Sequence, residues 1–139
     1  MRYLLLSFVL AAAMPPTAQA QLGGGHWDSG THHSVDEHKK NAAELEETIK
    51  KDPSNIELYI RLGFTYSKLE KADDAQRAFE NAVRLDPKRA IAHYMLGLIY
   101  EKKGLKEKAI SAWQACLDNA TEPHLRDTAI KHLHHLRTN

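Results

Sequence analysis

Histidine and carboxylate side chains gather near the N-terminus, and these are residue types that could bind a metal ion. Nine histidines occur in 139 residues, and acidic residues accompany the first four of them. Imidazole and carboxylate groups are common ligands of divalent transition metals. A metal-binding protein that uses this segment is therefore the alternative function, although no spacing matches a zinc motif such as H-E-x-x-H. The candidate metal ligands are His26, His32, His33 and His38.

The other motifs give no support to catalysis. His132 and His135 are one helical turn apart, but they also lack a diagnostic zinc spacing. The sequence contains no Gly-x-Ser-x-Gly elbow, no phosphate-binding loop and no nucleophile with an evident base. We therefore predict a protein that is not an enzyme and that needs no cofactor.

Charge and cysteine content exclude further classes of function. Lys and Arg total 19 against 18 for Asp and Glu, which gives a formal net charge of +1. Without a concentrated basic stripe, neither nucleic acid nor an anionic membrane surface is an expected partner. The single cysteine, Cys116, excludes an internal disulfide and is expected to be a buried small apolar residue.

The first twenty residues have the order of a secretory signal peptide. Arg2 is followed by an apolar run over 3–14, a Pro-Pro pair at 15–16 and Ala-Gln-Ala at 18–20. A membrane-spanning helix needs about 20 apolar residues, so this run is too short for stable membrane insertion. We predict that residues 1–20 are removed and that the protein is exported, to a periplasm as first choice and as a secreted protein as second.

Two dipeptides recur at a fixed interval in the rest of the chain. Asp-Pro occurs at 52–53 and at 86–87, and Leu-Gly at 62–63 and at 96–97, each pair 34 residues apart. A fixed period of about 20–50 residues is typical of stacked supersecondary units, which bury their apolar faces against neighbouring units. The repeat therefore favours a binding scaffold.

Apolar residues inside each copy follow helical spacing. Tyr59, Leu62 and Tyr66 line one face of a first helix, and Ala75 and Phe79 line one face of a second. No alternating run of β-branched residues suggests a strand. We predict an all-α fold with a Gly- and His-rich flexible tail over 21–35 and a helical domain over 36–137. That domain comprises an N-terminal helix, helix-turn-helix units over 56–89 and 90–123, and a capping helix over 124–137.

The two copies resemble the tetratricopeptide repeat, a 34-residue helix-turn-helix with a W-x₂-L-G-x₂-Y…A-x₃-F…P pattern. Glu70 stands where the turn glycine is usual, and Thr121 stands where the second closing proline is usual. The resemblance implies a small exported protein of this family, with two full repeats in a solenoid. The matching residues are Tyr59, Leu62, Gly63, Tyr66, Ala75, Phe79, Ala82 and Pro87, then His93, Leu96, Gly97, Tyr100, Gly104, Ala109, Trp113 and Cys116.

In this family the first helices of successive repeats line a concave groove that receives a peptide or a helix. The positions where some members clamp a C-terminal carboxylate with Lys and Asn carry apolar residues and Tyr94 here, so that clamp is missing. An apolar patch with a charged rim suits the hydrophobic face of a helix or an extended peptide. The implied groove residues are Ile60, Phe64, Lys68, Ile91, Tyr94, Leu98, Glu101 and Lys102.

The resemblance thus implies a non-enzymatic adaptor that binds a protein or peptide, and similar proteins suggest the assembly of an envelope complex. An alternative is that the groove is covered by the tail, by the last helix or by a second copy of the chain. Stable stacks usually contain about three repeats, whereas this chain has two with flanking helices. A homodimer is therefore a further expectation to test.

Overall fold

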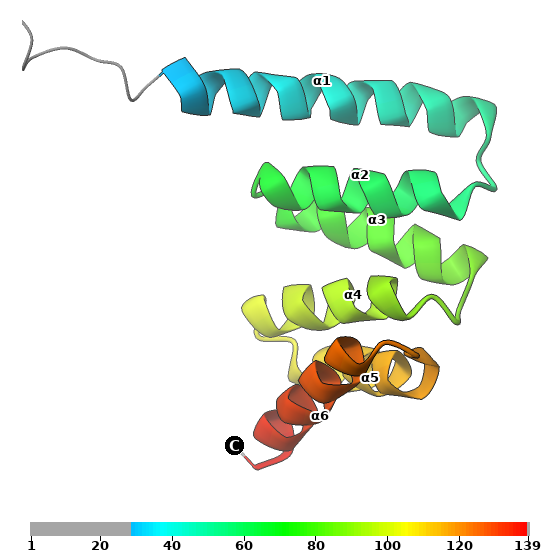
Figure 1. The fold of residues 1–139 in the computed structure, drawn as a ribbon, viewed down its shortest axis with the longest axis vertical. Coiled ribbons are helices and arrows are strands. Elements are labelled where there is room, and N and C mark those ends of the chain that lie inside the picture. Colours follow the sequence, from blue (N-terminus) through cyan, green and yellow to red (C-terminus); the bar gives the residue numbers. More distant parts are fainter. Residues whose placement is uncertain (1–28, 139) are drawn as a thin grey trace, which may run out of the picture.

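The computed structural model describes residues 29–138, which form six helices and no strand. The predicted all-α repeat fold is confirmed for this part of the chain, and the predicted signal peptide and residues 21–28 lie outside it. The helices follow one another down the molecule in sequence order (Figure 1). They are α1 (Ser29–Lys51), α2 (Ile56–Lys68), α3 (Ala72–Leu85), α4 (Ala90–Lys102), α5 (Lys106–Asn119) and α6 (Pro123–Thr138).

Neighbouring helices in the sequence pack against one another, so α2 with α3 and α4 with α5 form the two expected hairpins. Helix α1 packs on α2, and α6 packs on α5 and also touches α4. In Figure 1, α6 lies in front of α5 at the C-terminal end of the stack. Helices α1 and α6 therefore flank the hairpins at opposite ends.

Helix α1 begins at Ser29, earlier than the predicted start at residue 36. Residues 29–35 had been assigned to the flexible tail, and their backbone is helical instead. Ala42 and Leu45 bury the C-terminal part of α1 against its neighbour. No proline lies between Ser29 and Lys51, and extending an existing helix by one residue costs little, so the helical backbone can continue upstream of the packed part.

In each repeat, a side chain near the start of the first helix hydrogen-bonds to the proline of the preceding Asp-Pro turn. The Tyr59 hydroxyl donates to the Pro53 carbonyl oxygen at 3.1 Å. One period later, the His93 Nε2–H donates to the Pro87 carbonyl oxygen at 2.7 Å. His93 stands where the first repeat has Tyr59, and it makes the equivalent hydrogen bond to its turn.

An aromatic ring from the second helix of each hairpin packs directly against the glycine of the Leu-Gly pair. A Cβ added at Gly63 would lie 2.6 Å from the ring of Phe79, and one at Gly97 would lie 2.6 Å from the ring of Trp113. Both rings are fully buried. Because separations under 3.0 Å are sterically excluded for real Cβ atoms, only glycine permits this close approach of the paired helices.

The turns inside the two hairpins have the same backbone conformation but different residues. Glu70 has φ 58° and Gly104 has φ 70°, which is the left-handed region that favours glycine. In both turns the next residue donates its amide to a carbonyl five residues earlier: Lys71 to Tyr66 and Leu105 to Tyr100, each at 2.9 Å. The first hairpin thus holds a strained glutamate where the second has an unstrained glycine.

Candidate functional site

The predicted groove residues lie on α2 and α4, but one of them is not at the surface. Ile60 is only 5% exposed and belongs to the core cluster that contains Ala92 and Leu96. Packing of α2 against its neighbours thus buries this side chain, so we leave Ile60 out of the candidate surface. Leu98 and Ile91 are half-buried, whereas Lys68 and Lys102 are exposed.

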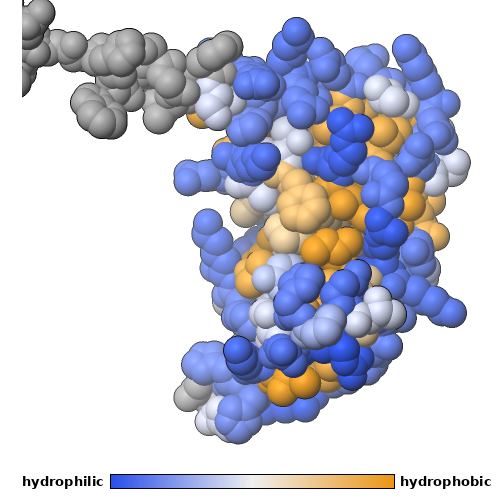
Figure 2. Space-filling model, in the orientation of Figure 1, coloured by the Kyte–Doolittle hydropathy of each residue, from blue (hydrophilic) through white to orange (hydrophobic). Residues whose placement is uncertain are grey.

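Phe64 and Tyr94 form part of both the surface and the core. Phe64 meets the ring of Phe79 edge-on with centroids 5.4 Å apart, and Tyr94 meets Trp113 edge-on at 5.3 Å. Both remain half-buried. Figure 2 shows a strip of hydrophobic surface across the middle of this face, bordered by hydrophilic residues. Phe64 and Tyr94 thus contribute partly exposed apolar surface on α2 and α4.

A cavity of about 170 Å³ lies between α4 and the part of the first hairpin where α2 ends and α3 begins, and we call it the α2–α4 seam. Ser67 lines it from α2, and Met95, Leu98 and Lys102 line it from α4. The turn after α2 also brings Glu70 and the first residues of α3 to this place. Leu98 and Lys102 were among the predicted groove residues, whereas Met95 and the two alanines of α3 were not. The helical spacing of apolar residues shows which face of a helix is buried, but it does not show which residues of another helix or turn lie opposite that face. The α3 residues are Ala72 and Ala75.

A second cavity, of about 390 Å³, lies one repeat later between α4 and α6, and we call it the α4–α6 seam. Glu101 of α4 accepts hydrogen bonds there from the Trp113 indole Nε1–H and from His132 Nδ1, the latter at 2.7 Å. The His132 ring also stacks on Trp113, with centroids 4.3 Å apart and an interplanar angle of 19°. Glu101, predicted for partner binding, is thus held by the chain itself. Lys131 and His135 complete the lining.

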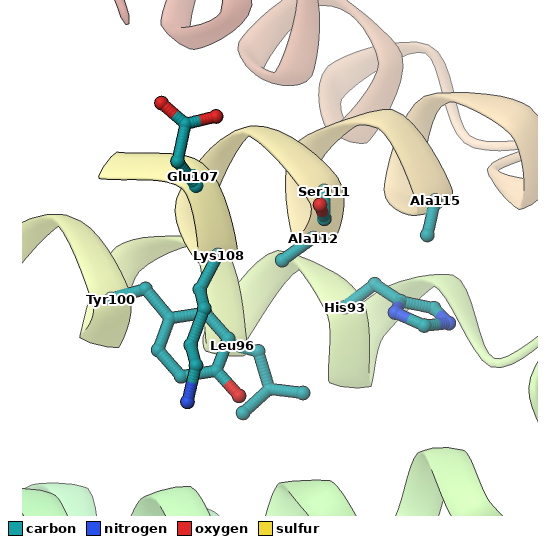
Figure 3. A pocket seen from close by; sticks show the side chains of 8 residues that line it. All are labelled: His93, Leu96, Tyr100, Glu107, Lys108, Ser111, Ala112 and Ala115. Atoms are coloured by element: carbon teal, nitrogen blue, oxygen red, sulfur yellow. The ribbon is translucent and has the colours of Figure 1, made fainter. Parts of the chain in front are cut away.

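A third hollow, of about 420 Å³, lies on the α4–α5 hairpin and was not predicted (Figure 3). Lys108 extends along the Tyr100 ring, with its Nζ 5.7 Å from the centroid, while Glu107 points away. The Tyr100 hydroxyl donates to Glu80 of α3 at 2.8 Å, and burial first, then this bond, raises the pKa of Tyr100. The small side chains Ser111, Ala112 and Ala115 leave the hollow open.

The candidate metal ligands lie largely outside the part of the chain that the structure describes. His26 precedes Ser29, the side chains of His32 and His33 are not described, and His38 is half-buried on α1. Within the described residues, no group of three or more His, Cys, Asp or Glu side chains is arranged to hold a metal ion. The His-rich segment as a metal site therefore stays a prediction.

Two further expectations concern Cys116 and the membrane. Cys116 is fully buried, as predicted, and burial, with a contribution from Glu122, raises the pKa of its thiol to about 11. A thiol with this pKa is almost entirely protonated near neutral pH and is unreactive. Between residues 29 and 138, no helix is both long enough and apolar enough to span a bilayer.

The helical hairpins, the glycines under aromatic rings and the repeated turn bonds recur at one period, and residues 60–120 match the Tetratricopeptide repeat family profile. Residues 60–120 of this chain are tetratricopeptide repeats. Curated relatives carry the same repeat in longer chains. Tetratricopeptide repeat protein 37 of Xenopus laevis is 29% identical over 85 residues, 59% of this chain and 5% of its own length.

Two other relatives are more similar in sequence. Interferon-induced protein with tetratricopeptide repeats 2 of Mus musculus is 37% identical over 71 residues, which is 50% of this chain and 15% of that protein. Small glutamine-rich tetratricopeptide repeat-containing protein 2 of Saccharomyces cerevisiae is 33% identical over 85 residues, 58% and 25% of the two chains. The chain thus spans a quarter or less of the length of each of these relatives.

Solved structures share the fold of the repeats. Protein BPP2914 from Bordetella parapertussis superposes with a TM-score of 0.57 at 25% identity, covering 70% of this chain and 87% of its own. MamA superposes with a TM-score of 0.50 at 19% identity, covering 73% and 66% of the two chains. The repeat fold supports a role as a scaffold for protein–protein interaction.

Proposed function

We propose that this protein is a non-enzymatic adaptor whose partner protein binds on α2 and α4, with a side chain in the α2–α4 seam. The observation that carries the proposal is the contrast between the two seams. The α2–α4 seam is lined mainly by apolar and small side chains. In the α4–α6 seam, Glu101 and His132 already satisfy each other, so a partner gains less there.

The surface around the α2–α4 seam supports the same proposal. Phe64, Tyr94 and Leu98 are held in place by the core yet remain partly exposed. Rigid aromatic and aliphatic groups of this kind supply contact area at little cost in conformational entropy, as interface anchors do. An apolar strip with a polar border is typical of a protein interaction site.

We further propose that the adaptor acts outside the cytoplasm, in the assembly of an envelope complex. The support is the sequence of residues 1–20, in which an apolar run, a Pro-Pro pair and Ala-Gln-Ala follow one another. N-terminal sequencing of the protein from a periplasmic fraction tests this part, and it should begin at Gln21. A mature protein that begins at Met1 and remains in the cytoplasm would contradict export.

A site-specific crosslink in cells tests the binding surface. A benzophenone amino acid replaces the exposed Lys68 beside the seam in one strain, and the exposed Lys106 at the start of α5 in a control strain. We expect light to give one discrete adduct with another protein from position 68 and none from position 106. Equal crosslinking from both positions, no adduct at all, or an adduct with a second copy of the chain alone would each contradict the proposal.

A further inference from the structure

We infer that the partner segment on the α2–α4 seam is an acidic amphipathic helix, with one bulky apolar side chain inside the seam and carboxylates that meet Lys68 and Lys102. This inference rests on the function proposed above and adds the chemistry of the partner. It follows from the size of the cavity, from two lysines that have no acceptor among the described residues and from the way the nearby acidic residues are used.

The size and lining of the seam fit one apolar side chain. Its volume of about 170 Å³ is below the about 300–1,000 Å³ that is typical of small-molecule sites. Ala72 and Ala75 contribute little side-chain bulk, and Met95 and Leu98 supply apolar contacts. The flexible thioether of Met95 can adapt to side chains of different shape. The seam is therefore suited to Leu, Ile, Phe or Met from a partner.

Two lysines beside the seam have no acceptor within residues 29–138. Lys68 and Lys102 stand at the same place in the two repeats, in the last turns of α2 and α4, and both are exposed. The adjacent Lys103, in contrast, donates to Asp73 Oδ1 and Gln76 Oε1, each at 2.7 Å. Unpaired cations at the edge of an apolar patch attract carboxylates and select against basic partners.

The acidic side chains that line the two seams do not neutralise these lysines. Glu101 directs Oε1 to Trp113 and His132 rather than to Lys102. Glu70 lines the α2–α4 seam and is the one carboxylate that residues 29–138 contribute to its lining. Lys102 lines the same seam, and the exposed Lys68, which follows the lining residue Ser67 in α2, adds a second positive charge next to it.

The direction of the apolar strip favours a helical partner. Phe64 lies about one helical turn before the lining residue Ser67 on α2, and Tyr94 lies about one turn before the lining residue Leu98 on α4. Apolar surface therefore continues along both helices, and several apolar residues of a partner can find contacts. A helix presents such residues on one face at i, i+3 and i+4 and leaves acidic residues on either side of them. Recognition then uses side-chain carboxylates and not a chain terminus.

An unbiased peptide selection tests the inference. A phage-displayed library of random peptides is panned on the full chain, on Lys68→Glu with Lys102→Glu, and on a control with the same charge change elsewhere, Lys51→Glu with Lys106→Glu. We expect the wild-type chain and the control to enrich peptides with Asp or Glu flanking Leu, Ile, Phe or Met at helical spacing. The seam variant should lose these peptides and enrich basic ones.

The possible failures are distinguishable. Enrichment of neutral or basic peptides by the wild-type chain, or of the same acidic peptides by the seam variant, overturns the inference and leaves the proposed adaptor function standing. No enrichment on any of the folded proteins overturns both. Circular dichroism and thermal melting confirm folding, and Lys68→Gln with Lys102→Gln serves as the milder variant if the reversal unfolds the chain.

The affinity of an enriched acidic peptide gives a second readout. Fluorescence anisotropy with the labelled peptide should show about tenfold weaker binding to the Lys68→Gln, Lys102→Gln variant than to the wild-type chain. The control variant should bind as the wild type does, and added salt should weaken wild-type binding more than that of the Gln variant. Equal affinity of the Gln variant and the wild type would overturn the role of the two lysines.

Discussion

The α2–α4 seam and the α4–α6 seam occupy successive places in the same stack, yet the first is largely apolar and the second polar. Ser67 and Leu98 line the first. One period later, the corresponding positions are Glu101 and His132, which hydrogen-bond to each other in the second. The backbone repeat thus fixes where a seam lies. Individual side chains decide whether the chain closes the seam itself or leaves it available for a partner.

The largest expected effect concerns a feature that the two hairpins share. Gly63→Leu and Gly97→Leu should each lower the free energy of unfolding by about 3 kcal/mol or more, because the new side chain would overlap a fully buried ring. Urea denaturation followed by circular dichroism measures both. If one substitution were neutral, the two hairpins would not share this packing. The two seams could then not be compared as corresponding places in the repeat.

The next effect should separate the seams. Glu101→Ala removes the acceptor of the buried Trp113 indole and of His132, and we expect a loss of about 2 kcal/mol. At the matched position, the Ser67 hydroxyl donates only to the carbonyl of Gly63 in its own helix, so Ser67→Ala should change stability by about 0.5 kcal/mol or less. Urea unfolding of both variants tests the difference. Equal losses would mean that Glu101 and His132 do not hold α6.

The turns differ by a smaller amount. Glu70→Gly should raise the free energy of unfolding by about 1 kcal/mol, because it removes a left-handed non-glycine residue. Gly104→Ala should lower it by about the same amount. Thermal melting of the two variants measures both shifts, and a destabilised Glu70→Gly protein would show that the glutamate side chain stabilises the turn by contacts of its own.

The smallest expected effect is on the pH dependence of the melting temperature. Burial and a hydrogen bond to Glu46 raise the pKa of Tyr66 to about 12, and burial raises that of Cys116 to about 11. Both groups lose protons more readily when unfolded, so their contribution is complete below the unfolded pKa and declines as pH rises through the folded pKa. We expect melting temperatures to fall from about pH 9 upward, and Cys116→Ala to reduce the fall. An unchanged slope in that variant would contradict the role of Cys116.

Much of the fold was predictable from the sequence, because the information is local and repeated. Glycine at 63 and 97, the large rings that pack on them and the Asp-Pro turns recur at one period. The start of α1 was missed, since residues 29–35 have no apolar pattern and their helix is an extension of a packed segment. Helical phase therefore identifies packed helices better than it identifies where they begin.

The candidate site was predictable only in part. The family resemblance named Leu98 and Lys102, which line a cavity, and it also named Ile60, which tertiary packing buries. The bond between Glu101 and His132 joins residues 31 apart on different helices. One signal was available, because His132 lies one period after Leu98 and Glu101 one period after Ser67. Comparing the two repeats position by position would have suggested a polar second seam.

The most direct test of a partner side chain in the α2–α4 seam is an NMR titration of the chain with a peptide selected as above. Met95 is the one methionine within residues 29–138 and lines this seam, whereas the Trp113 indole Nε1–H reports on the α4–α6 seam. We predict that peptide binding shifts the Met95 methyl resonance saturably and leaves the indole resonance in place. A shift of the indole with an unmoved Met95 methyl would contradict the account.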